Sequence, residues 1–315
     1  MDFGRVEDPR QRDRIDWSLP SLESAEERAQ LERLARAAAR DPRPPRLRVG
    51  MPVWGEAAWI GRLYPKGSKG TETLREYARH FDTVEINSTF YAVPPRATFA
   101  RWRDAVPEHF RFCPKLPQSI SRSVAGALDT RELEAFVSGA LELGDRLGQC
   151  FVQLPPAASP ACLGELDALL SAIPRALRIA VELRHEGFFR ERRLRPEIVD
   201  FLARHRAAAV ITDTAGFREL AHASLSSTRA LVRFASSDDP AIDDRRLRDW
   251  AARIATWFAS GLRELDVTLH AKDPLAQLTM ARSLSTHMNE ALASRGLPLS
   301  VPVLETIDER QRALF

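Results

Sequence analysis

The stretch DTVEIN (82–87) decides the fold, because its apolar and polar side chains alternate over six residues. Val84 and Ile86 share one face of an extended chain, while Glu85 and Asn87 share the other. In a closed barrel of strands, one such face packs under surrounding helices and the other points to the barrel axis. The alternation therefore predicts a barrel strand that directs a carboxylate and an amide inward.

Seven further β-rich runs follow at regular intervals and are separated by helical patterns such as TETLREYARHF. Alternating strands and helices imply parallel strands joined by crossovers, and eight such units fit a single (β/α)8 TIM-like barrel. A doubly wound open sheet is the alternative, but the glycine-rich turns typical of that fold do not occur. The seven runs are LRVGMPV (47–53), FRFCPK (110–115), CFVQL (150–154), IAVELR (179–184), AAVITD (208–213), LVRFA (231–235) and LDVTLH (265–270).

Residues 1–46 differ from the rest, because they are rich in Arg, Glu, Asp and Pro and nearly lack β-branched residues. The capping-box pattern SAEE (24–27) opens a helix with Leu34 on its apolar stripe, and Asp41-Pro42 ends it. We therefore divide the chain into a charged, partly helical or flexible N-terminal extension and a barrel domain over 47–315. The helix either packs across the bottom of the barrel or binds a partner.

Composition excludes several classes of protein. The formal net charge of +3 is too small to argue for nucleic acid by itself. Cys113, Cys150 and Cys162 are scattered, which argues against disulfides and metal sites. The charged N-terminus is no signal peptide, and no apolar run reaches the roughly 18–20 residues needed to span a bilayer. The sequence predicts a cytoplasmic protein without a membrane partner, and leaves its oligomeric state open.

The same alternation predicts a polar side chain at the inward-facing end of nearly every strand. Charges inside a barrel are costly unless they lie near water, a ligand or each other. The carboxyl-terminal mouth, where barrel enzymes have their active sites, meets this condition. A purely structural ion network is the alternative, but such networks often stabilise less than apolar replacements do. The set comprises Glu85, Asn87, Lys115, Gln153, Glu182, Arg184, Asp213, Arg233 and His270.

These strand ends also carry a resemblance to a known family. The blocks TVEINSTFY (83–91) and QLPP (153–156) resemble the YecE-like family, domain of unknown function 72, over about residues 47–295. The resemblance implies a TIM-like barrel and no established reaction. Two segments depart from the family pattern: Ser-Arg (121–122) replaces a frequent Thr-His pair, and GMPVW (50–54) replaces Gly-Thr-Ser-Gly-Trp. The hydroxyls lost from that first loop leave it without an evident role.

The first hypothesis is an enzyme of hydrolase or lyase type that acts on a small anionic or sugar-like substrate. Basic side chains would hold a phosphate or carboxylate, and paired carboxylates would act as acid and base. Amides would orient a hydroxyl or carbonyl group, and aromatic rings would stack on a sugar ring. The predicted catalytic residues are Glu85, Glu182, Lys115 and Asp213; the predicted substrate-binding residues are Trp54, Asn87, Tyr91, Gln153, Arg184, Arg233 and His270.

Three variants of this hypothesis stay open, and none requires an organic cofactor. A divalent metal could bind Glu85, Glu182, Asp213 and His270, although nearby cations would repel it. Lys115 could form a Schiff base, since burial lowers a lysine pKa. A two-carboxylate glycosidase needs carboxyl groups about 5–9 Å apart, which strands two and five disfavour because they lie well round the barrel from each other.

The second hypothesis is a non-catalytic module that binds an anion or a nucleic acid. Nucleic-acid binding would show as a basic stripe interleaved with aromatic residues. Only RERRLR (190–195), beside Phe188 and Phe189, has this density, and such a run is more often the solvated start of a helix. A small polar or anionic molecule is therefore the predicted partner.

Overall fold

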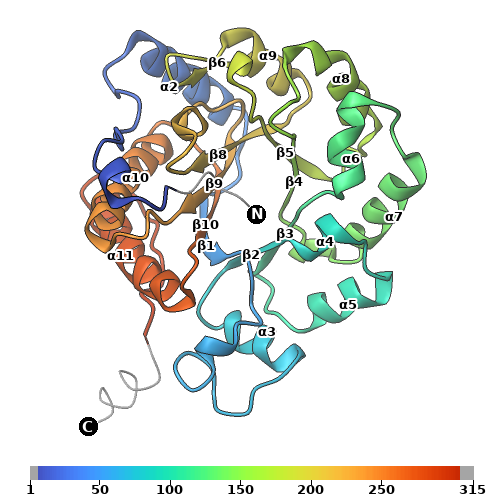
Figure 1. Ribbon diagram of the computed structural model, residues 1–315, viewed down its shortest axis with the longest axis vertical. Helices are drawn as coiled ribbons and strands as arrows, with labels where there is room; N and C mark the ends of the chain where they lie inside the picture. The colour runs from blue at the N-terminus through green and yellow to red at the C-terminus, as the bar shows by residue number, and fades with distance from the viewer. Residues whose placement is uncertain (1–5, 306–315) are drawn as a thin grey trace.

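A computed structural model describes residues 6–305 of the chain. Eight parallel strands form one sheet in the order β3-β2-β1-β10-β9-β8-β5-β4, and Figure 1 shows them around a common centre with helices outside. The predicted eight-unit barrel is confirmed, and the doubly wound alternative is excluded. The strands are β1 (Arg46–Met51), β2 (Thr83–Ile86), β3 (Arg111–Pro114), β4 (Gln149–Gln153), β5 (Arg178–Glu182), β8 (Ala208–Asp213), β9 (Arg229–Ala235) and β10 (Glu264–His270).

The ring closes between β3 and β4 through a short contact. Gly148 N donates to Phe112 O at 2.8 Å, and Leu116 N donates to Phe151 O at 2.8 Å. A Cβ atom on Gly148 would lie 2.8 Å from Phe112 O, so this close approach requires glycine. The barrel is therefore nearly closed, with its weakest seam between these two strands.

Eleven α-helices lie within residues 6–305, most of them on the outside of the barrel (Figure 1). The two longest begin with proline after a capping aspartate: Asp239 Oδ1 accepts from Ile242 N, and Asp273 Oδ1 accepts from Leu275 N. The helices are α1 (Pro9–Arg12), α2 (Ala25–Ala38), α3 (Thr71–Tyr77), α4 (Ser88–Tyr91), α5 (Arg96–Asp104), α6 (Gln118–Arg122), α7 (Thr130–Leu141), α8 (Leu163–Ala172), α9 (Pro196–Arg204), α10 (Pro240–Ala259) and α11 (Pro274–Ala293).

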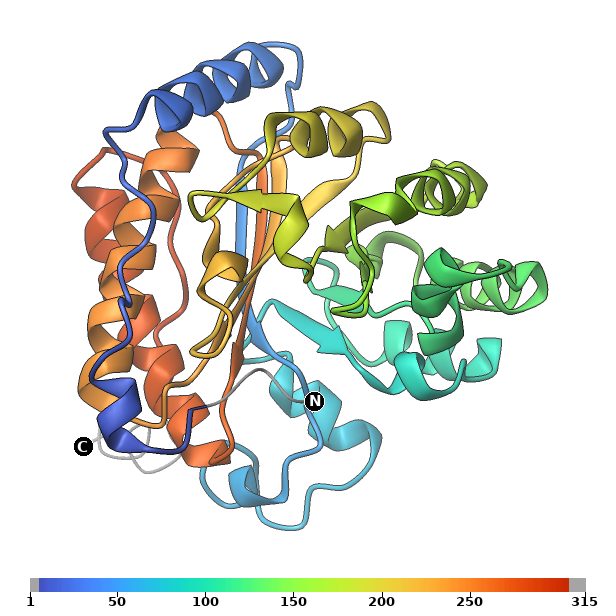
Figure 2. The ribbon, with the colours of Figure 1, turned by 45° about the horizontal axis from the view of Figure 1, so that its top comes forward.

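The helix of the N-terminal extension, α2, packs on the barrel. Ser24 caps it as predicted, since its Oγ accepts from Glu27 N at 3.1 Å. The Glu27 carboxylate is buried and binds Arg193 Nη1 at 2.8 Å. At its other end Ala38 O accepts from Arg263 Nη2 at 3.1 Å, next to the start of β10. Figure 2 shows α2 beside the starting end of β1, so it crosses the amino-terminal side of the barrel.

The barrel interior has an apolar layer between two charged layers. Phe151, Ala180, Ala208, Val210 and Leu231 form a separate buried apolar cluster inside the ring. Charged side chains from the same strands lie above it, towards the strands' carboxyl ends, and below it, towards their amino ends. The outward faces of the strands carry the larger apolar cores that pack under the helices.

The run RERRLR does not start a helix. Phe189–Arg190 and Arg193–Leu194 form the antiparallel strands β6 and β7, and α9 begins only at Pro196. Glu191 and Arg192 both have positive φ, which is the backbone geometry of a two-residue hairpin turn. Because Arg193 is buried against the extension, this run does not present a continuous basic stripe.

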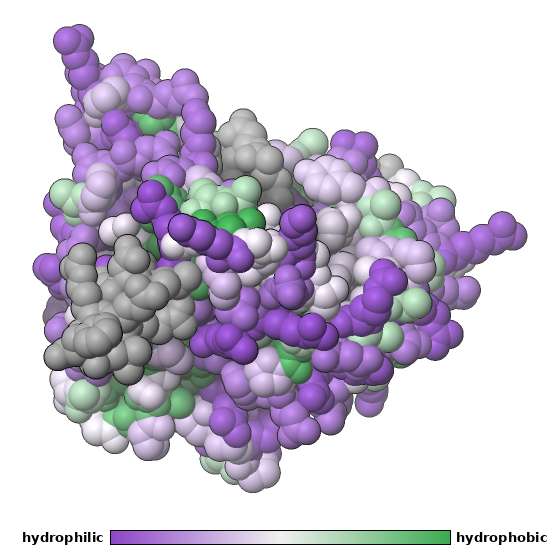
Figure 3. Space-filling model, turned by 90° about the horizontal axis from the view of Figure 1, so that it is seen from below, coloured by the Kyte–Doolittle hydropathy of each residue, from purple (hydrophilic) through white to green (hydrophobic). Residues whose placement is uncertain are grey.

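Two further expectations concern the surface and the thiols. Cys113, Cys150 and Cys162 are free thiols, as predicted, and all three are buried. Within residues 6–305, no helix is long and apolar enough to cross a membrane. The face seen in Figure 3 is mostly hydrophilic, with apolar side chains in scattered groups.

Candidate functional site

One guanidinium group joins two carboxylates inside the carboxyl-terminal mouth of the barrel. Arg233 donates from Nε and Nη2 to Glu85 at 3.0 and 2.8 Å, and from Nη1 to Glu182 Oε2 at 2.6 Å. All three side chains are buried. Glu85 and Glu182, expected to lie far apart, are therefore held within the span of one arginine.

Glu85 is the most heavily bonded member of this group. Its carboxylate also accepts from Asn87 Nδ2 at 2.9 Å and from Thr268 Oγ1 at 2.9 Å, and His270 Nε2 lies 3.2 Å away. Burial would raise the pKa of Glu85, but Arg233 and His270 together outweigh burial and hold the pKa well below its ordinary value. Glu85 is therefore ionised at neutral pH, and its lone pairs are committed to protein donors.

Glu182 connects the arginine to a buried lysine. Gln153 Nε2 donates to Glu182 Oε1 at 2.8 Å, and Gln153 Oε1 accepts from Lys115 Nζ at 2.8 Å. Burial would raise the pKa of Glu182, but Arg233, Arg184 and Lys115 together lower it. Glu182 is thus also ionised, and Gln153 bridges it to the lysine through two hydrogen bonds.

Lys115 is the group whose charge can change near neutral pH. Burial, reinforced by the positive charge of Arg233, lowers the pKa of Lys115 to about 8, while Glu182 opposes that shift. The ammonium group also lies 4.0 Å from the centre of the Phe90 ring. A lysine in this condition can give up and take back a proton during a reaction.

His270 contributes a neutral imidazole to the cluster. Burial lowers its pKa below the ordinary 6.5, and Glu85 only partly offsets this effect. The ring is therefore uncharged at pH 7, and it can share one proton with the Glu85 and Thr268 oxygens.

Three polar atoms at this mouth point to a ligand. Among the described residues, Asn87 Oδ1, Arg184 Nε and Thr212 Oγ1 are buried without a hydrogen-bond partner. The Asn87 amide is oriented by its bond to Glu85, and Arg184 Nε lies 3.3 Å from Glu182 Oε1 without hydrogen-bond geometry. Each such atom costs about 1–3 kcal/mol when left unpaired. A polar molecule that offered both donors and acceptors would satisfy them.

Asp213 does not join the cluster, so the expectation that it faces the barrel axis is wrong. Its carboxylate binds Arg246 Nη2 at 2.9 Å and Trp250 Nε1 at 2.7 Å, both on α10, and also pairs with Arg218. Ala208 and Val210 fill the inner face of β8, so the opposite face carries Asp213. Burial would raise the pKa of Asp213, but the two arginines lower it to about 2. Asp213 therefore links the end of β8 to α10.

The two aromatic residues expected to stack on a substrate make ring contacts with other aromatic side chains. Trp54 is partly buried and packs edge-to-face on Trp102, with ring centres 5.4 Å apart. Tyr91 is 70% exposed and packs against Phe90. Phe90, the third residue of α4, contacts the cluster through Lys115, and the Phe151 ring lies 5.2 Å from the Arg233 guanidinium. Neither ring was among the predicted site residues.

The four proposed metal ligands are not gathered at one point. His270 and Glu85 are in contact, but Asp213 lies on the other face of β8. Within residues 6–305, no three His, Cys, Asp or Glu side chains come together as a metal site. Thr268 and Thr212 were not among the predicted site residues. Thr268 alternates with apolar neighbours in LDVTLH (265–270), whereas AAVITD (208–213) gives no such signal for Thr212.

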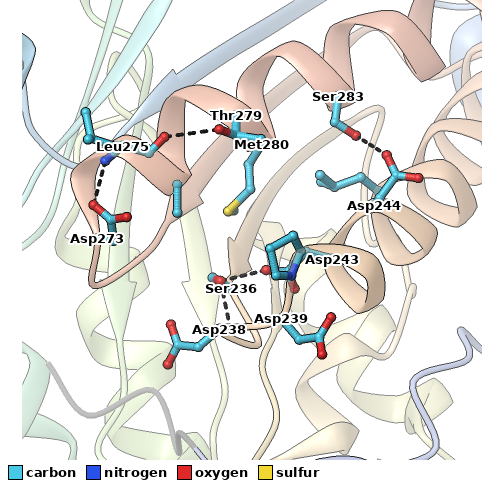
Figure 4. Close-up of a pocket in the computed structure, with 13 residues that line it drawn as sticks. Ser236, Asp238, Asp239, Asp243, Asp244, Asp273, Leu275, Thr279, Met280 and Ser283 are labelled. Atoms are coloured by element: carbon cyan, nitrogen blue, oxygen red, sulfur yellow. Dashed lines mark hydrogen bonds between the residues drawn. The ribbon is translucent and has the colours of Figure 1, made fainter.

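A hollow of about 440 Å³ lies on the same side of the barrel, beside the ends of β9 and β10 (Figure 4). It is lined by five aspartates, but most of them are committed to the fold. Asp239 and Asp273 cap helices, and Asp244 accepts from Ser283 Oγ at 2.6 Å. The hollow lies next to the end of β10, where Ser236 N donates to His270 O at 2.7 Å, but none of the cluster side chains lines it.

Comparison with known proteins identifies the family. The model described as "Protein of unknown function DUF72" matches residues 48–301. The chain belongs to the DUF72 family. The UPF0759 protein YecE of Escherichia coli K12 is 29% identical over 272 residues, which is 81% of this chain and 97% of that protein. The UPF0759 protein YunF of Bacillus subtilis 168 is 28% identical over 115 residues, covering 34% of this chain and 39% of that protein.

A solved DUF72 structure shares the fold. The crystal structure of a DUF72 family protein from Enterococcus faecalis V583 superposes with a TM-score of 0.63 at 20% identity. The superposition covers 78% of this chain and 96% of that one. At this identity the likeness supports the barrel and carries no information about the reaction.

Proposed function

We propose that this DUF72 protein is an enzyme of lyase type that acts on a small anionic, hydroxylated substrate at the carboxyl-terminal mouth, with Lys115 as its acid–base group. The observation that carries the proposal is the buried lysine with a pKa of about 8 at the mouth where three buried polar atoms have no hydrogen-bond partner among the described residues. With that pKa, about a tenth of the lysine is unprotonated at pH 7, which suffices for a general base.

The charge balance of the cluster favours an anion. Arg233, Arg184 and Lys115 carry positive charge, whereas Glu85 and Glu182 are the two carboxylates they contact. The imidazole of His270 is neutral, so the group has one positive charge in excess when the lysine is protonated. A carboxylate or phosphate on the substrate would balance that excess and accept a hydrogen bond from Arg184 Nε.

In this proposal the two glutamates position other groups, and the lysine moves the proton. Both carboxylates have lowered pKa values, so neither is a good general acid at neutral pH. This favours Lys115 over the carboxylate acid–base pair that the sequence suggested. The unprotonated Nζ would take a proton from a carbon next to a carbonyl group, and the electron pair would move onto the carbonyl oxygen. Asn87 Oδ1 would accept from a substrate hydroxyl.

Hydrogen–deuterium exchange into candidate substrates tests this directly. The protein would be incubated in D₂O with sugar acids, 2-oxo acids and phosphorylated sugars, and carbon-bound deuterium would be measured by NMR. We expect exchange with one class, lost in Lys115→Arg, which keeps the charge but does not release a proton near pH 7. Retention of exchange in Lys115→Arg would overturn the assignment of the base.

The second candidate function is binding of the same class of anion without turnover. It is favoured by the tight internal pairing of Arg233, which leaves the centre of the cluster rigid. The same samples distinguish the two. A ligand that raises the Tm of both wild type and Lys115→Arg, with no exchange and no product in either, would support a binding module.

A further inference from the structure

The amino-terminal mouth of the barrel carries its own cluster of charges. Four of the eight barrel strands begin with arginine: β1 with Arg46, β3 with Arg111, β5 with Arg178 and β9 with Arg229. Parallel strands all begin at the same end of a barrel, so these residues surround one opening. In register they pair with Glu264 and other inward-facing residues, so they lie on the inner side of the rim.

A hollow of about 190 Å³ opens between these arginines. An adjoining hollow of about 490 Å³ shares Arg111 and Arg178 with it. Arg43 reaches the rim from the extension, which ends beside the start of β1. The hollow is lined by Arg43, Arg46, Arg48, Arg111, Arg178 and Arg263, with the carboxylate of Glu264 facing them.

The carboxylates next to the smaller hollow are already bound to arginines, and the adjoining hollow has Glu108 and Asp145 in its own lining. Glu264 accepts from Arg48 at 2.9 Å and from Arg178 at 2.8 Å. Two acids that do not line the hollow form ion pairs with two of the six lining arginines. Asp266 binds Arg48 at 3.1 Å, and Asp41 binds Arg43 at 2.6 Å. The acids therefore serve three of the six arginines.

The other three arginines have no carboxylate partner within the described chain. Arg111 donates to the carbonyl oxygens of Glu108 and Phe110, and Arg263 donates to those of Asp41 and Ala38. Arg46 makes no side-chain hydrogen bond or ion pair there. Carbonyl groups carry no net charge, so these three guanidinium groups have no ion-pair partner among the described residues at the hollow, and Glu264 and Asp266 only partly offset the charge of Arg111.

Titration behaviour agrees with this excess. Burial lowers the pKa of Arg111, and the positive charge of Arg48 adds to the effect. Burial also lowers the pKa of Arg229 to about 10, with Glu264 opposing and Arg178 adding to the shift. The fold therefore gathers cations at this rim at a cost in stability, and a bound anion would relieve that cost.

We propose that the amino-terminal mouth binds a compact anion with two or three linked phosphates. Guanidinium groups match phosphate oxygens with paired hydrogen bonds, and arginine is the side chain best suited to such contacts. The hollow is smaller than the roughly 300–1,000 Å³ of sites for drug-sized ligands, which favours a compact polyphosphate over a large organic molecule. The apolar layer between the two mouths makes this site separate from the candidate active site.

Calorimetric titration of the full chain with inorganic tripolyphosphate tests the proposal. Arg46→Gln removes an exposed guanidinium without a partner, so it should fold normally, and Arg111→Gln removes a half-buried one. Arg36→Gln on α2 is the matched control, because Arg36 is exposed and removes the same charge elsewhere. We expect saturable binding, weakened about tenfold by each rim variant, the effect of losing one charge-assisted hydrogen bond, and unchanged by Arg36→Gln.

Two results would overturn the proposal. One is equal binding of tripolyphosphate by wild type, Arg46→Gln and Arg111→Gln. The other is a single-stranded oligonucleotide that binds more tightly than tripolyphosphate with a steep salt dependence, since that would assign the rim to nucleic acid. Melting temperatures without ligand show whether Arg111→Gln is folded, and Arg46→Gln keeps the test decisive if it is not.

Discussion

The two mouths of this barrel are built by the same eight strands but differ in their balance of charge. At the carboxyl-terminal mouth, Arg233 is fully paired with Glu85 and Glu182. At the amino-terminal mouth, Arg46 and Arg111 have no carboxylate partner among the described residues. The paired network holds its side chains in fixed positions, and Lys115 is the member whose protonation can change near neutral pH. This arrangement suits catalysis. A rim of arginines of which only some have carboxylate partners carries an excess of positive charge, which suits the capture of an anion.

The apolar layer explains how the two environments coexist. Phe151 belongs to that layer, and its ring also lies 5.2 Å from the Arg233 guanidinium. Leu231, Val210 and their neighbours form a buried apolar layer that separates the two mouths. Charges on one side are therefore poorly screened by solvent within the barrel, and each mouth has to be balanced by its own groups or by its own ligand.

The largest expected effect comes from removing Arg233, which pairs the carboxylates of the carboxyl-terminal mouth. Arg233→Met leaves two buried carboxylates without their common cation, so we expect a loss of about 3–5 kcal/mol in the free energy of unfolding. Urea denaturation followed by circular dichroism measures it. Arg248→Met, at an exposed arginine on α10, is the control and should change little. A loss below about 1 kcal/mol for Arg233→Met would mean that the network does not hold the barrel together.

The pH dependence of Lys115 gives the next largest effect. Its folded-state pKa of about 8 lies below the unfolded value of 10.5, so the unfolded chain binds more protons between these pH values. The loss of folding stability caused by burying the protonated lysine is complete below pH 8, and it disappears as the pH rises towards 10.5. Relative to wild type, Lys115→Met should therefore be more stable at pH 7 than it is above pH 10.5, by on the order of 2–3 kcal/mol.

That advantage should shrink between pH 8 and 10.5, which unfolding curves at several pH values would show. Lys272→Met, at an exposed lysine after β10, is the control and should show no such trend. An advantage of Lys115→Met that stayed constant across this range would mean that the lysine pKa is not lowered.

Asp213→Asn separates the fold from the candidate site. The change keeps the shape of a buried side chain but removes the charge that Arg246 binds, so we expect a loss of about 2 kcal/mol in unfolding free energy. Proton exchange into substrate, where found, should persist at temperatures at which the variant is folded. Asp244 is a partly exposed aspartate on α10, the helix that carries Arg246, and Asp244→Asn should lower the unfolding free energy by less. Loss of exchange in folded Asp213→Asn would return this residue to the candidate active site.

The contrast between these residues shows what the sequence could and could not reveal. Alternation predicted the inward faces of DTVEIN (82–87) and IAVELR (179–184), because apolar and polar residues there take opposite sides. It failed for Asp213 because AAVITD (208–213) is apolar on both faces, so the pattern does not show which face is inside. Periodicity also carries no information about which strands face each other across a ring, and so the shared guanidinium of Arg233 was not predictable.

The amino-terminal mouth was missed for another reason. Its arginines stand at the first residue of their strands, and strand boundaries are the least certain part of a sequence-based assignment. Each one by itself looks like an ordinary solvated arginine before a strand. Only the closed barrel brings Arg46, Arg111 and Arg178 to one opening, where Glu264 pairs with Arg178 but Arg46 and Arg111 have no carboxylate partner among the described residues.

The smallest expected effect concerns Arg46, at the amino-terminal mouth. Because Arg46 is exposed and repelled by its neighbours, Arg46→Gln should leave unfolding free energy within about 0.5 kcal/mol of wild type, on the stabilising side, at low ionic strength. Raising the salt concentration should erase the difference, since repulsion between exposed charges is screened over about 10 Å at 0.1 M. Arg36→Gln, whose arginine pairs with Glu32, should show no gain at either ionic strength. A loss of stability in Arg46→Gln would mean that the rim arginine is held by favourable contacts, and the mouth would then resemble the paired network above it.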